Sequence, residues 1–202
     1  MIDRPHTYII TGRSGCGKGT QADLLRKKLS LTEFPVFYLQ TGARFREFIE
    51  QNILTAQLSR DIMARGERQP SFLAVWLWTH FLMERATVDE HWIIDGAPRT
   101  LTEAMVLDSV LDFYMREKPV VVYLNVSRVW AESHLLARGR ADDKTLTEIG
   151  RRMEFFESDV KPAIEYYRTN THYSFIEING EQPIGAVHKE MATRVEALPN
   201  VQ

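Results

Sequence analysis

Short apolar runs and longer amphipathic segments alternate along the chain. Five runs rich in β-branched and aromatic residues have the length of strands, and they span residues 8–11, 36–39, 92–95, 120–124 and 175–178. Between them, apolar residues recur every three or four positions, the period of a helix with one buried face. Helices are therefore expected over residues 21–29, 54–65, 72–83, 101–113, 126–137, 146–167 and 184–198. Strands that alternate with helices predict an α/β fold with a doubly wound, five-stranded parallel sheet.

The pattern also makes three predictions about individual helices. Thr41-Gly42 follows the second predicted strand and is expected to cap a further helix. The periodic stretch over residues 146–167 contains Pro162, so we expect one long helix that bends near the proline. Trp76 and Trp78 lie in the most apolar helix and are predicted to pack in the core rather than to stack on a ligand.

Length and composition set limits on function. A chain of 202 residues suits one domain with insertions or lids. The net charge of −2 provides no general basic field, so no nucleic-acid partner is expected. The apolar runs are too short and interrupted for a membrane span, and the first ten residues do not have the apolar core of a signal peptide. The single cysteine, Cys16, permits no internal disulfide, which suits a reducing cytoplasm, and no paired cysteine or histidine ligands suggest zinc.

The sequence GRSGCGKGTQ at residues 12–21 joins the first predicted strand to the first predicted helix. Glycines allow a tight turn whose N–H groups point inward, the helix N-terminus adds partial positive charge, and Lys18 adds a full charge. The spacing is that of the Walker A motif, G-x-x-x-x-G-K, except that Gly19 replaces the usual Ser or Thr and the hydroxyl follows at Thr20. The stretch predicts a cradle for nucleotide phosphates; a glycine-rich turn with an exposed lysine is the alternative.

Charged residues follow the other predicted strands. Ligands of a doubly wound sheet bind at the carboxyl ends of its strands, and Asp95 ends the third strand. An acid there is a candidate for binding Mg²⁺, directly or through water, whereas a helix-capping role is the alternative. Guanidinium groups bind phosphate in a bidentate manner, and the candidates near strand ends are Arg46, Arg99, Arg138, Arg140 and Arg151. So many positive charges suit the transfer of a phosphoryl group between two polyphosphates, whereas ordinary surface arginines are the alternative.

Four motifs occur in order: GxxGxGKGTQ at residues 12–21, TGxxxR at 41–46, DGxPRT at 95–100 and RGRxDD at 138–143. Together they resemble the adenylate kinase branch of the nucleoside monophosphate kinases, and the resemblance covers nearly the whole chain. It also accounts for Gly19, because the family's loop reads GKGT. The resemblance implies a P-loop kinase that converts Mg·ATP and a nucleoside monophosphate, with AMP as the leading acceptor, reversibly into ADP and a diphosphate.

The resemblance implies roles residue by residue. ATP is expected to contact Gly12, Gly15, Cys16, Gly17, Lys18, Gly19, Thr20, His134, Arg138 and Gln182. The monophosphate is expected to contact Thr41, Gly42, Arg46, Gln69, Gly96, Ala97, Pro98, Arg99, Glu103, Arg140 and Arg151. Catalysis is expected to depend on Lys18, Arg99, Arg138, Arg140 and Arg151, and Asp95 is expected to lie near Mg²⁺.

The resemblance also implies how the chain is organised. One P-loop kinase domain is expected, with a core of residues 1–39, 70–137 and 145–202, a helical monophosphate-binding segment at about 40–69 and a short lid at about 138–144. No zinc is expected in such a lid. The expected partners are nucleotides, and a cytoplasmic monomer is expected.

Four residues depart from the family's pattern. Ala43 lies where an acid usually approaches the Mg²⁺ waters, His134 where an arginine often packs on the ATP base, and Ala97 where Phe is common. Glu103 replaces the Gln that reads the adenine edge, and an ionised carboxylate can only accept hydrogen bonds. GMP or a pyrimidine monophosphate is therefore the alternative acceptor. Two other classes stay open: a nucleotide-binding regulator with little turnover, and an NTPase without an acceptor.

Overall fold

Five parallel strands form the centre of the computed structural model, which describes residues 4–139 and 145–199. The strands are β1 (Thr7–Gly12), β2 (Val36–Gln40), β3 (His91–Asp95), β4 (Val120–Asn125) and β5 (Ser174–Asn179), in the spatial order β2-β3-β1-β4-β5. Every neighbouring pair is parallel. The predicted α/β fold with a five-stranded parallel sheet is confirmed.

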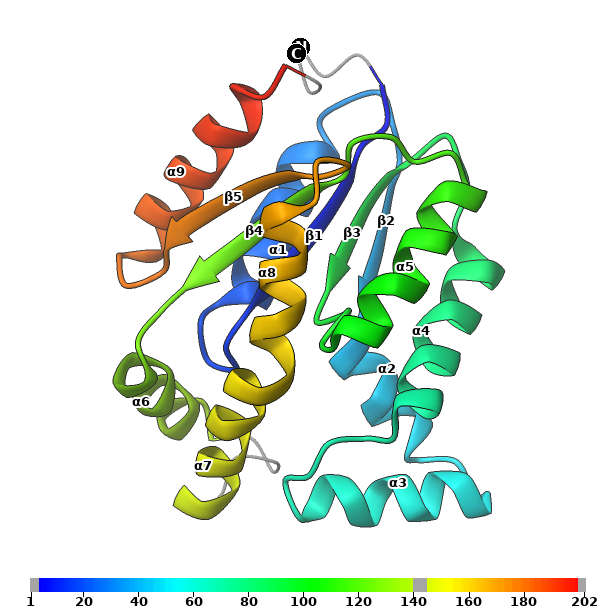
Figure 1. Ribbon diagram of the computed structural model, residues 1–202, viewed down its shortest axis with the longest axis vertical. Helices are drawn as coiled ribbons and strands as arrows, with labels where there is room; N and C mark the ends of the chain where they lie inside the picture. Colours follow the sequence, from blue (N-terminus) through cyan, green and yellow to red (C-terminus); the bar gives the residue numbers. More distant parts are fainter. Residues whose placement is uncertain (1–3, 140–144, 200–202) are drawn as a thin grey trace.

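Helices cover both faces of the sheet (Figure 1). On one face lie α1 (Lys18–Leu29) and α9 (Ile184–Glu196), and on the other lie α4 (Ser71–Arg85), α5 (Leu101–Phe113) and α8 (Lys161–Thr169). Four more helices lie toward the carboxyl ends of the strands (Figure 1): α2 (Thr41–Phe48), α3 (Leu54–Ala64), α6 (Arg128–Arg138) and α7 (Leu146–Phe155). This arrangement leaves the carboxyl edge of the sheet as the place where loops and helix ends converge.

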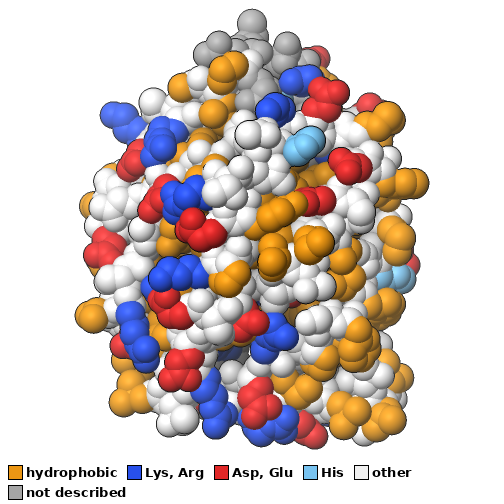
Figure 2. Space-filling view, viewed as in Figure 1, with side chains coloured by type: hydrophobic (Ala, Val, Ile, Leu, Met, Phe, Trp, Pro, Cys, Tyr) orange, Lys and Arg blue, Asp and Glu red, His pale blue; other side chains and the backbone are white. Residues whose placement is uncertain are grey.

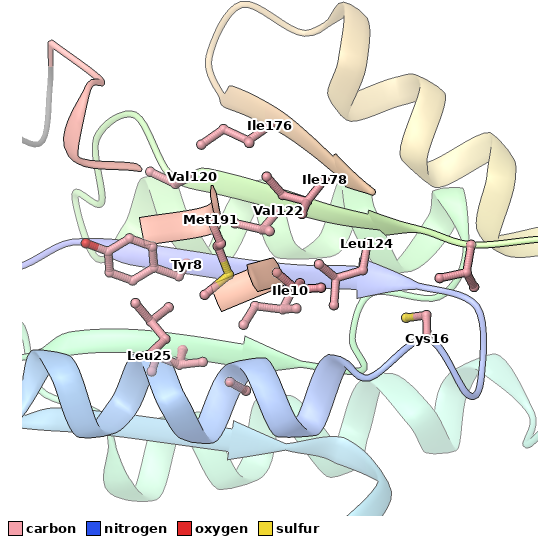
Figure 3. Close-up of a cluster of buried hydrophobic side chains, with 14 of the residues drawn as sticks. Tyr8, Ile10, Cys16, Leu25, Val120, Val122, Leu124, Ile176, Ile178 and Met191 are labelled. Carbon is pink, nitrogen blue, oxygen red and sulfur yellow. The ribbon is translucent and has the colours of Figure 1, made fainter. Parts of the chain in front are cut away.

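The strand residues alternate between two buried cores. Tyr8 and Ile10 pack with Met191 on the face covered by α1 and α9 (Figure 3), whereas Ile9 packs with Trp78 on the opposite face. Successive side chains of a strand point to opposite faces, so a sheet covered on both sides requires unbroken apolar runs. Full burial of a side chain of this size contributes about 1.5–3 kcal/mol. The two cores thus hold the strand ends, and the loops that follow them, in fixed places.

Three local predictions differ from the structure. Helix α1 begins at Lys18, three residues earlier than expected, so the lysine belongs to its first turn. Thr41 is the first residue of α2 rather than its cap, because Gln40 occupies the capping position. Trp78 is 1% exposed, as predicted, but Trp76 is 46% exposed and stacks on His80. Two residues separated by two positions lie about 200° apart around a helix, so both tryptophans cannot face one core.

The long helix predicted over residues 146–167 is interrupted by one wide turn. The residues Phe156–Val160 form a π turn between α7 and α8, and Pro162 lies in the first turn of α8. A proline ring clashes with the carbonyl four residues earlier and removes one N–H donor. The wider turn before it accommodates both effects, and such turns are frequent at functional sites. The irregularity lies near Pro162, as predicted, but it is a π turn that ends two residues before the proline.

The surface differs from one side to the other. Figure 2 shows apolar side chains gathered on the side of α4 and α5, whereas acidic and basic side chains intermingle on the opposite side of the view. Within the described ranges, no helix combines the length and the apolar character that a membrane crossing requires.

Candidate functional site

A cleft with a volume of about 800 Å³ opens where the loops after β1 and β3 meet α2, α6, α7 and the π turn. This volume is in the range of pockets that bind small molecules. Most of the residues predicted to bind nucleotide line it, although they come from distant parts of the sequence. They are Gly12, Gly15, Gly17, Lys18, Gly19, Thr20, Thr41, Gly42, Arg46, Gln69, Asp95, Gly96, Pro98, Arg99, Glu103, His134, Arg138 and Arg151.

The loop between β1 and α1 forms one end of the cleft. Gly15 has a φ of +87°, and a Cβ atom there would lie 2.5 Å from the carbonyl oxygen of Ala131, so only glycine fits. The Lys18 Nζ donates hydrogen bonds to the carbonyl oxygens of Gly12 and Arg13, both at 2.7 Å. The ammonium group therefore lies inside the loop at the N-terminus of α1, where backbone N–H groups and the helix dipole favour an anion. This end of the cleft can bind phosphate groups.

A second set of cationic groups lies across the cleft, near the start of α2. Arg46 lies beside Gly42, with the guanidinium Nη1 3.5 Å from the position of a Cβ on that glycine. The Nε of Arg99 donates to the carbonyl oxygen of Gly96 at 2.7 Å, which aims its guanidinium along the loop after β3. Thr41 is 2% exposed, and its Oγ1 has no hydrogen-bond partner among the described residues. Arg46 and Arg99 can therefore bind a second phosphate group at this end of the cleft. The Thr41 hydroxyl group can form a hydrogen bond with a polar group of the same ligand.

Glu103 lies at this second end, in the first turn of α5. Its N–H donates to the Oγ1 of Thr100 at 3.1 Å, and its Oε2 accepts from the N–H of Arg99 at 3.1 Å. Its side chain lines the cleft although the residue is only 4% exposed. Burial raises the pKa of Glu103, while the Arg99 amide and the charges of Arg99 and Arg68 oppose that rise. A carboxyl in this place can be neutral more readily than one in water.

Asp95 lies at the floor of the cleft, next to the phosphate loop. Its Oδ2 is 3.6 Å from the position of a Cβ on Gly19, and Thr20 belongs to the same lining. No cluster of three or more His, Cys, Asp or Glu residues that could hold a metal occurs in the described ranges. Mg²⁺ is usually held by one or two protein oxygens together with substrate phosphates and water. One carboxylate and one hydroxyl beside a phosphate cradle therefore fit Mg²⁺ and do not fit a metal bound by protein alone.

Two contacts join the opposite walls of the cleft. The Nη1 of Arg151 in α7 donates to the carbonyl oxygen of Arg65 at 2.5 Å. Arg68 pairs with Asp159 of the π turn at 2.7 Å. Both contacts link the segment after α3 to the helical wall that follows residue 145. The cleft is thus bridged on the side that lies away from the sheet.

Some predicted site residues lie elsewhere. The described lining of the cleft does not include Cys16, Ala97 or Gln182. Cys16 and Ala97 are buried in the two cores beneath the loops, whereas the Nε2 of Gln182 donates to the carbonyl oxygen of Asn179 and to Glu190, both at 2.9 Å. Arg140 and residues 140–144 of the predicted lid lie outside the described residues.

Two lining side chains have partners within the protein. The amide of Gln69 exchanges two hydrogen bonds of 2.9 Å with Ser59, one through each amide atom, so it braces the segment around α3. His134 stacks on Trp130 with ring centroids 4.4 Å apart, and its Nδ1 lies 2.8 Å from the Trp130 carbonyl oxygen. The side chains of Gln69 and His134 are therefore fixed in position by contacts with neighbouring residues.

Several side chains in and around the cleft were not predicted, and three of them hold its predicted parts in place. Tyr38 and Gln40 hydrogen-bond to Asp95. Arg13 ties the phosphate loop to the π turn: its Nη2 lies 2.6 Å from Glu157, and its guanidinium lies 4.0 Å above the ring of Phe156. The alternation of residues 38 and 40 along a strand that ends at the ligand edge was the signal that could have identified the first two.

Comparisons with known proteins agree with this geometry. Residues 10–172 match the family model described as Adenylate kinase. Adenylate kinase 1 of Nostoc sp. (strain PCC 7120) is 32% identical over 183 residues, which cover 91% of this chain and 95% of that protein. The adenylate kinase of Prochlorococcus marinus (strain MIT 9301) is 31% identical over 169 residues, covering 84% of this chain and 88% of that protein. That of Flavobacterium psychrophilum is 28% identical over 197 residues, covering 94% and 98%.

Proposed function

The chain belongs to the adenylate kinase family of nucleoside monophosphate kinases, and on this premise we propose that it transfers the γ-phosphoryl group of ATP to AMP and forms two molecules of ADP, reversibly. One observation carries the proposal: the cleft joins a lysine-containing phosphate loop to a second end that Arg46 and Arg99 line. An enzyme that only hydrolyses ATP has no use for this second phosphate site.

The phosphate loop would bind ATP. Phosphate oxygens that enter it would accept hydrogen bonds from Lys18, which now donates to two loop carbonyls, and from N–H groups at the start of α1. Arg138 ends α6, the helix that packs against Gly15 of the loop, and would add charge near the ATP phosphates. His134, held on Trp130, would offer a flat surface to the ATP base.

The second end of the cleft would bind AMP. Arg46 and Arg99 would bind its phosphate with their planar donors. Thr41, whose Oγ1 is buried and unpaired within the described residues, would offer a hydrogen bond near the nucleoside. Glu103 would lie at the base edge. AMP bound in this manner would point its phosphate at the γ-phosphate of ATP.

The residues would catalyse the transfer by position and charge. One oxygen of the AMP phosphate attacks the γ-phosphorus, the bond from that phosphorus to the β–γ bridging oxygen breaks, and ADP leaves with that oxygen. Lys18, Arg99, Arg138 and Arg151 would stabilise the charge that spreads over the transferred group. Bound Mg²⁺ would neutralise part of the phosphate charge, and Asp95 and Thr20 are the residues that would hold it. No covalent intermediate with the protein is required.

The bridging contacts favour exclusion of water. Arg151 reaches the carbonyl of Arg65, and Arg68 reaches Asp159, so the wall that contains α7 meets the segment after α3. Closure of such walls protects the transferred group from hydrolysis. We assign residues of about 40–69 to the monophosphate-binding segment and residues of about 138–144 to a short lid without zinc.

The protonation state of Glu103 decides which of two acceptors, AMP or GMP, fits this end of the cleft. An ionised carboxylate suits the adjacent N1–H and N2–H₂ donors of guanine, whereas a protonated one can serve adenine as glutamine does. The raised pKa of Glu103 supports the second form and therefore AMP. GMP is the alternative acceptor within the same reaction.

The remaining proposals concern the cellular location, the partners and the oligomeric state of the protein. The single cysteine supports a reducing cytoplasm, and the net charge of −2 argues against a nucleic-acid partner. We propose a monomer that acts on free nucleotides and not at a membrane.

A coupled assay of ADP formation across AMP, GMP, CMP and UMP tests the function. ADP should form rapidly only when Mg²⁺, ATP and a monophosphate are all present, and fastest with AMP. Binding of ATP without turnover for every acceptor would support a regulator instead.

A further inference from the structure

Three side chains on two adjacent strands, Tyr38 and Gln40 of β2 and Asp95 of β3, converge next to the phosphate loop. Gln40 is the register partner of Asp95 where β2 pairs with β3. Tyr38 precedes Gln40 by two residues, so the pleat places both side chains on the same face of the sheet as the carboxylate. That face is the one covered by α1, which begins in the phosphate loop.

The hydrogen bonds within this group select one oxygen of the carboxylate. The hydroxyl of Tyr38 donates to the Oδ2 of Asp95 at 3.2 Å, and the Nε2 of Gln40 donates to the same Oδ2 at 3.3 Å. The Nε2 of Gln40 also lies 3.1 Å from the Tyr38 hydroxyl oxygen, which closes a triangle. Among the described residues, Oδ1 receives no hydrogen bond, and Asp95 is 6% exposed.

The group lies directly against the phosphate loop. A Cβ atom on Gly19 would be 3.4 Å from the Nε2 of Gln40 and 3.6 Å from the Oδ2 of Asp95. Arg26 of α1 holds the other side of the tyrosine, because its guanidinium lies 5.5 Å from the ring centroid. The Tyr38 hydroxyl lies 3.2 Å from a carboxylate oxygen, which can only accept, so the hydroxyl is the donor of this pair.

We propose that Tyr38 and Gln40 are positioning residues that hold the Oδ2 of Asp95 and leave Oδ1 for the water shell of the Mg²⁺ that accompanies ATP. The inference rests on the proposed function, because it assigns Asp95 to the metal. A tyrosine hydroxyl and an amide are neutral donors, so they fix the orientation of the carboxylate without cancelling the charge that attracts a cation. A lysine or arginine in the same place would orient Asp95 but would also compete with the metal. Groups that orient a metal ligand in this manner typically affect metal affinity by about 10- to 100-fold.

The test compares the affinity of the protein for Mg·ATP with its affinity for metal-free ATP in EDTA. Isothermal titration calorimetry without AMP gives both Kd values, so the result does not depend on turnover. Tyr38→Phe and Gln40→Met remove the donors at nearly constant size, and Asp95→Asn provides the reference for loss of the carboxylate. Tyr114→Phe is the matched control, because Tyr114 packs against Trp92 in the core cluster, away from the cleft.

In Tyr38→Phe and Gln40→Met, the Kd for Mg·ATP should rise about tenfold, while the Kd for metal-free ATP should stay within about twofold of wild type. Asp95→Asn should show the same selective loss, and Tyr114→Phe should show none. Equal changes in both Kd values, or no change in either, would overturn the proposal, since a merely structural role has no preference for the metal. If wild type binds Mg·ATP as expected but forms no ADP with any monophosphate, the proposed function fails while the positioning role stands.

Discussion

Replacing Glu103 by Gln changes one buried carboxyl group at the acceptor end of the cleft into an amide of the same size. The Oε2 of Glu103 accepts an N–H from Arg99 at 3.1 Å, and a glutamine carbonyl oxygen can accept the same bond. The local backbone should therefore be kept. What changes is the charge at neutral and alkaline pH, and the gain of an N–H donor that does not depend on pH.

The size of the effect follows from the mismatch with adenine. An ionised Glu103 can accept from the N6 amino group but sets its charge against the N1 lone pair. A buried mismatch of this kind costs about 1–3 kcal/mol, which corresponds to about five- to 150-fold in affinity at 1.4 kcal/mol per factor of ten. Glu103→Gln should thus raise kcat/KM for AMP by about this factor at alkaline pH and lower it for GMP.

The pH dependence identifies the protonation state. Because burial raises the pKa of Glu103, wild type should bind AMP better below that pKa and worse as pH rises through it. The advantage of Glu103→Gln for AMP should accordingly shrink on acidification. Glu84→Gln, a change at an exposed residue of α4, is the control. The AMP phosphate titrates in all three proteins alike, so the ratio between variants isolates Glu103.

The raised pKa of Glu103 also determines how the free energy of unfolding changes with pH. The folded-state pKa of Glu103 lies above its ordinary value of 4.5, so its contribution to the free energy of unfolding is fully present below pH 4.5 and is lost as pH rises through the folded-state pKa. Urea unfolding should show a smaller decline with rising pH in Glu103→Gln than in wild type. If Glu103→Gln matches wild type in acceptor preference and in both pH profiles, Glu103 does not face the base and the reasoning is refuted.

Three further predictions concern charge, metal and acid stability. Lys18→Ala and Arg99→Ala should each lower kcat/KM about a hundredfold or more in the coupled assay, whereas Arg168→Ala, which removes a surface pair with Glu177, should change it little; equal losses would contradict the assigned roles. Elemental analysis of the purified protein should find no stoichiometric zinc, and finding it would contradict a short lid. Burial lowers the pKa of His91 to about 4 from 6.5, helped by the charges of His6 and Arg116, so stability should fall as pH falls from about 6.5 to about 4. His91→Gln should weaken that fall in chemical denaturation, and an unchanged profile would contradict this cause.

Sequence was sufficient for features that depend on neighbouring residues. The strands follow from short apolar runs, because a sheet covered on both faces buries every position, as Ile9 and Ile10 illustrate. The phosphate loop follows from glycine spacing. The arginines at the second end, Arg46 and Arg99, follow from the rule that parallel strands end at one edge, and the cleft brings them together.

Features that depend on register or on distant contacts could not be predicted in this manner. The hydrogen bond between Tyr38 and Asp95 joins residues 57 positions apart, and it forms only because β2 pairs with β3 in this register. The pair of Arg68 with Asp159 spans 91 positions. Apolar residues recur every three or four positions through Phe156, Val160 and Ile164 as well, so the apolar pattern over residues 146–167 did not reveal that Phe156–Val160 form a π turn. Trp76 was misplaced because its apolar helix suggested burial all round.

The fate of the γ-phosphorus of ATP tests the central claim most directly. The measurement supplies ATP labelled at the γ-phosphate with Mg²⁺, with and without AMP, and separates the labelled products over time. If Lys18 and the arginines of the second site act on two nucleotides, the label should appear in the β-phosphate of ADP, in step with ATP consumption and only when AMP is present. Release of the label as inorganic phosphate at the same rate with and without AMP would show that water is the acceptor and would contradict the account.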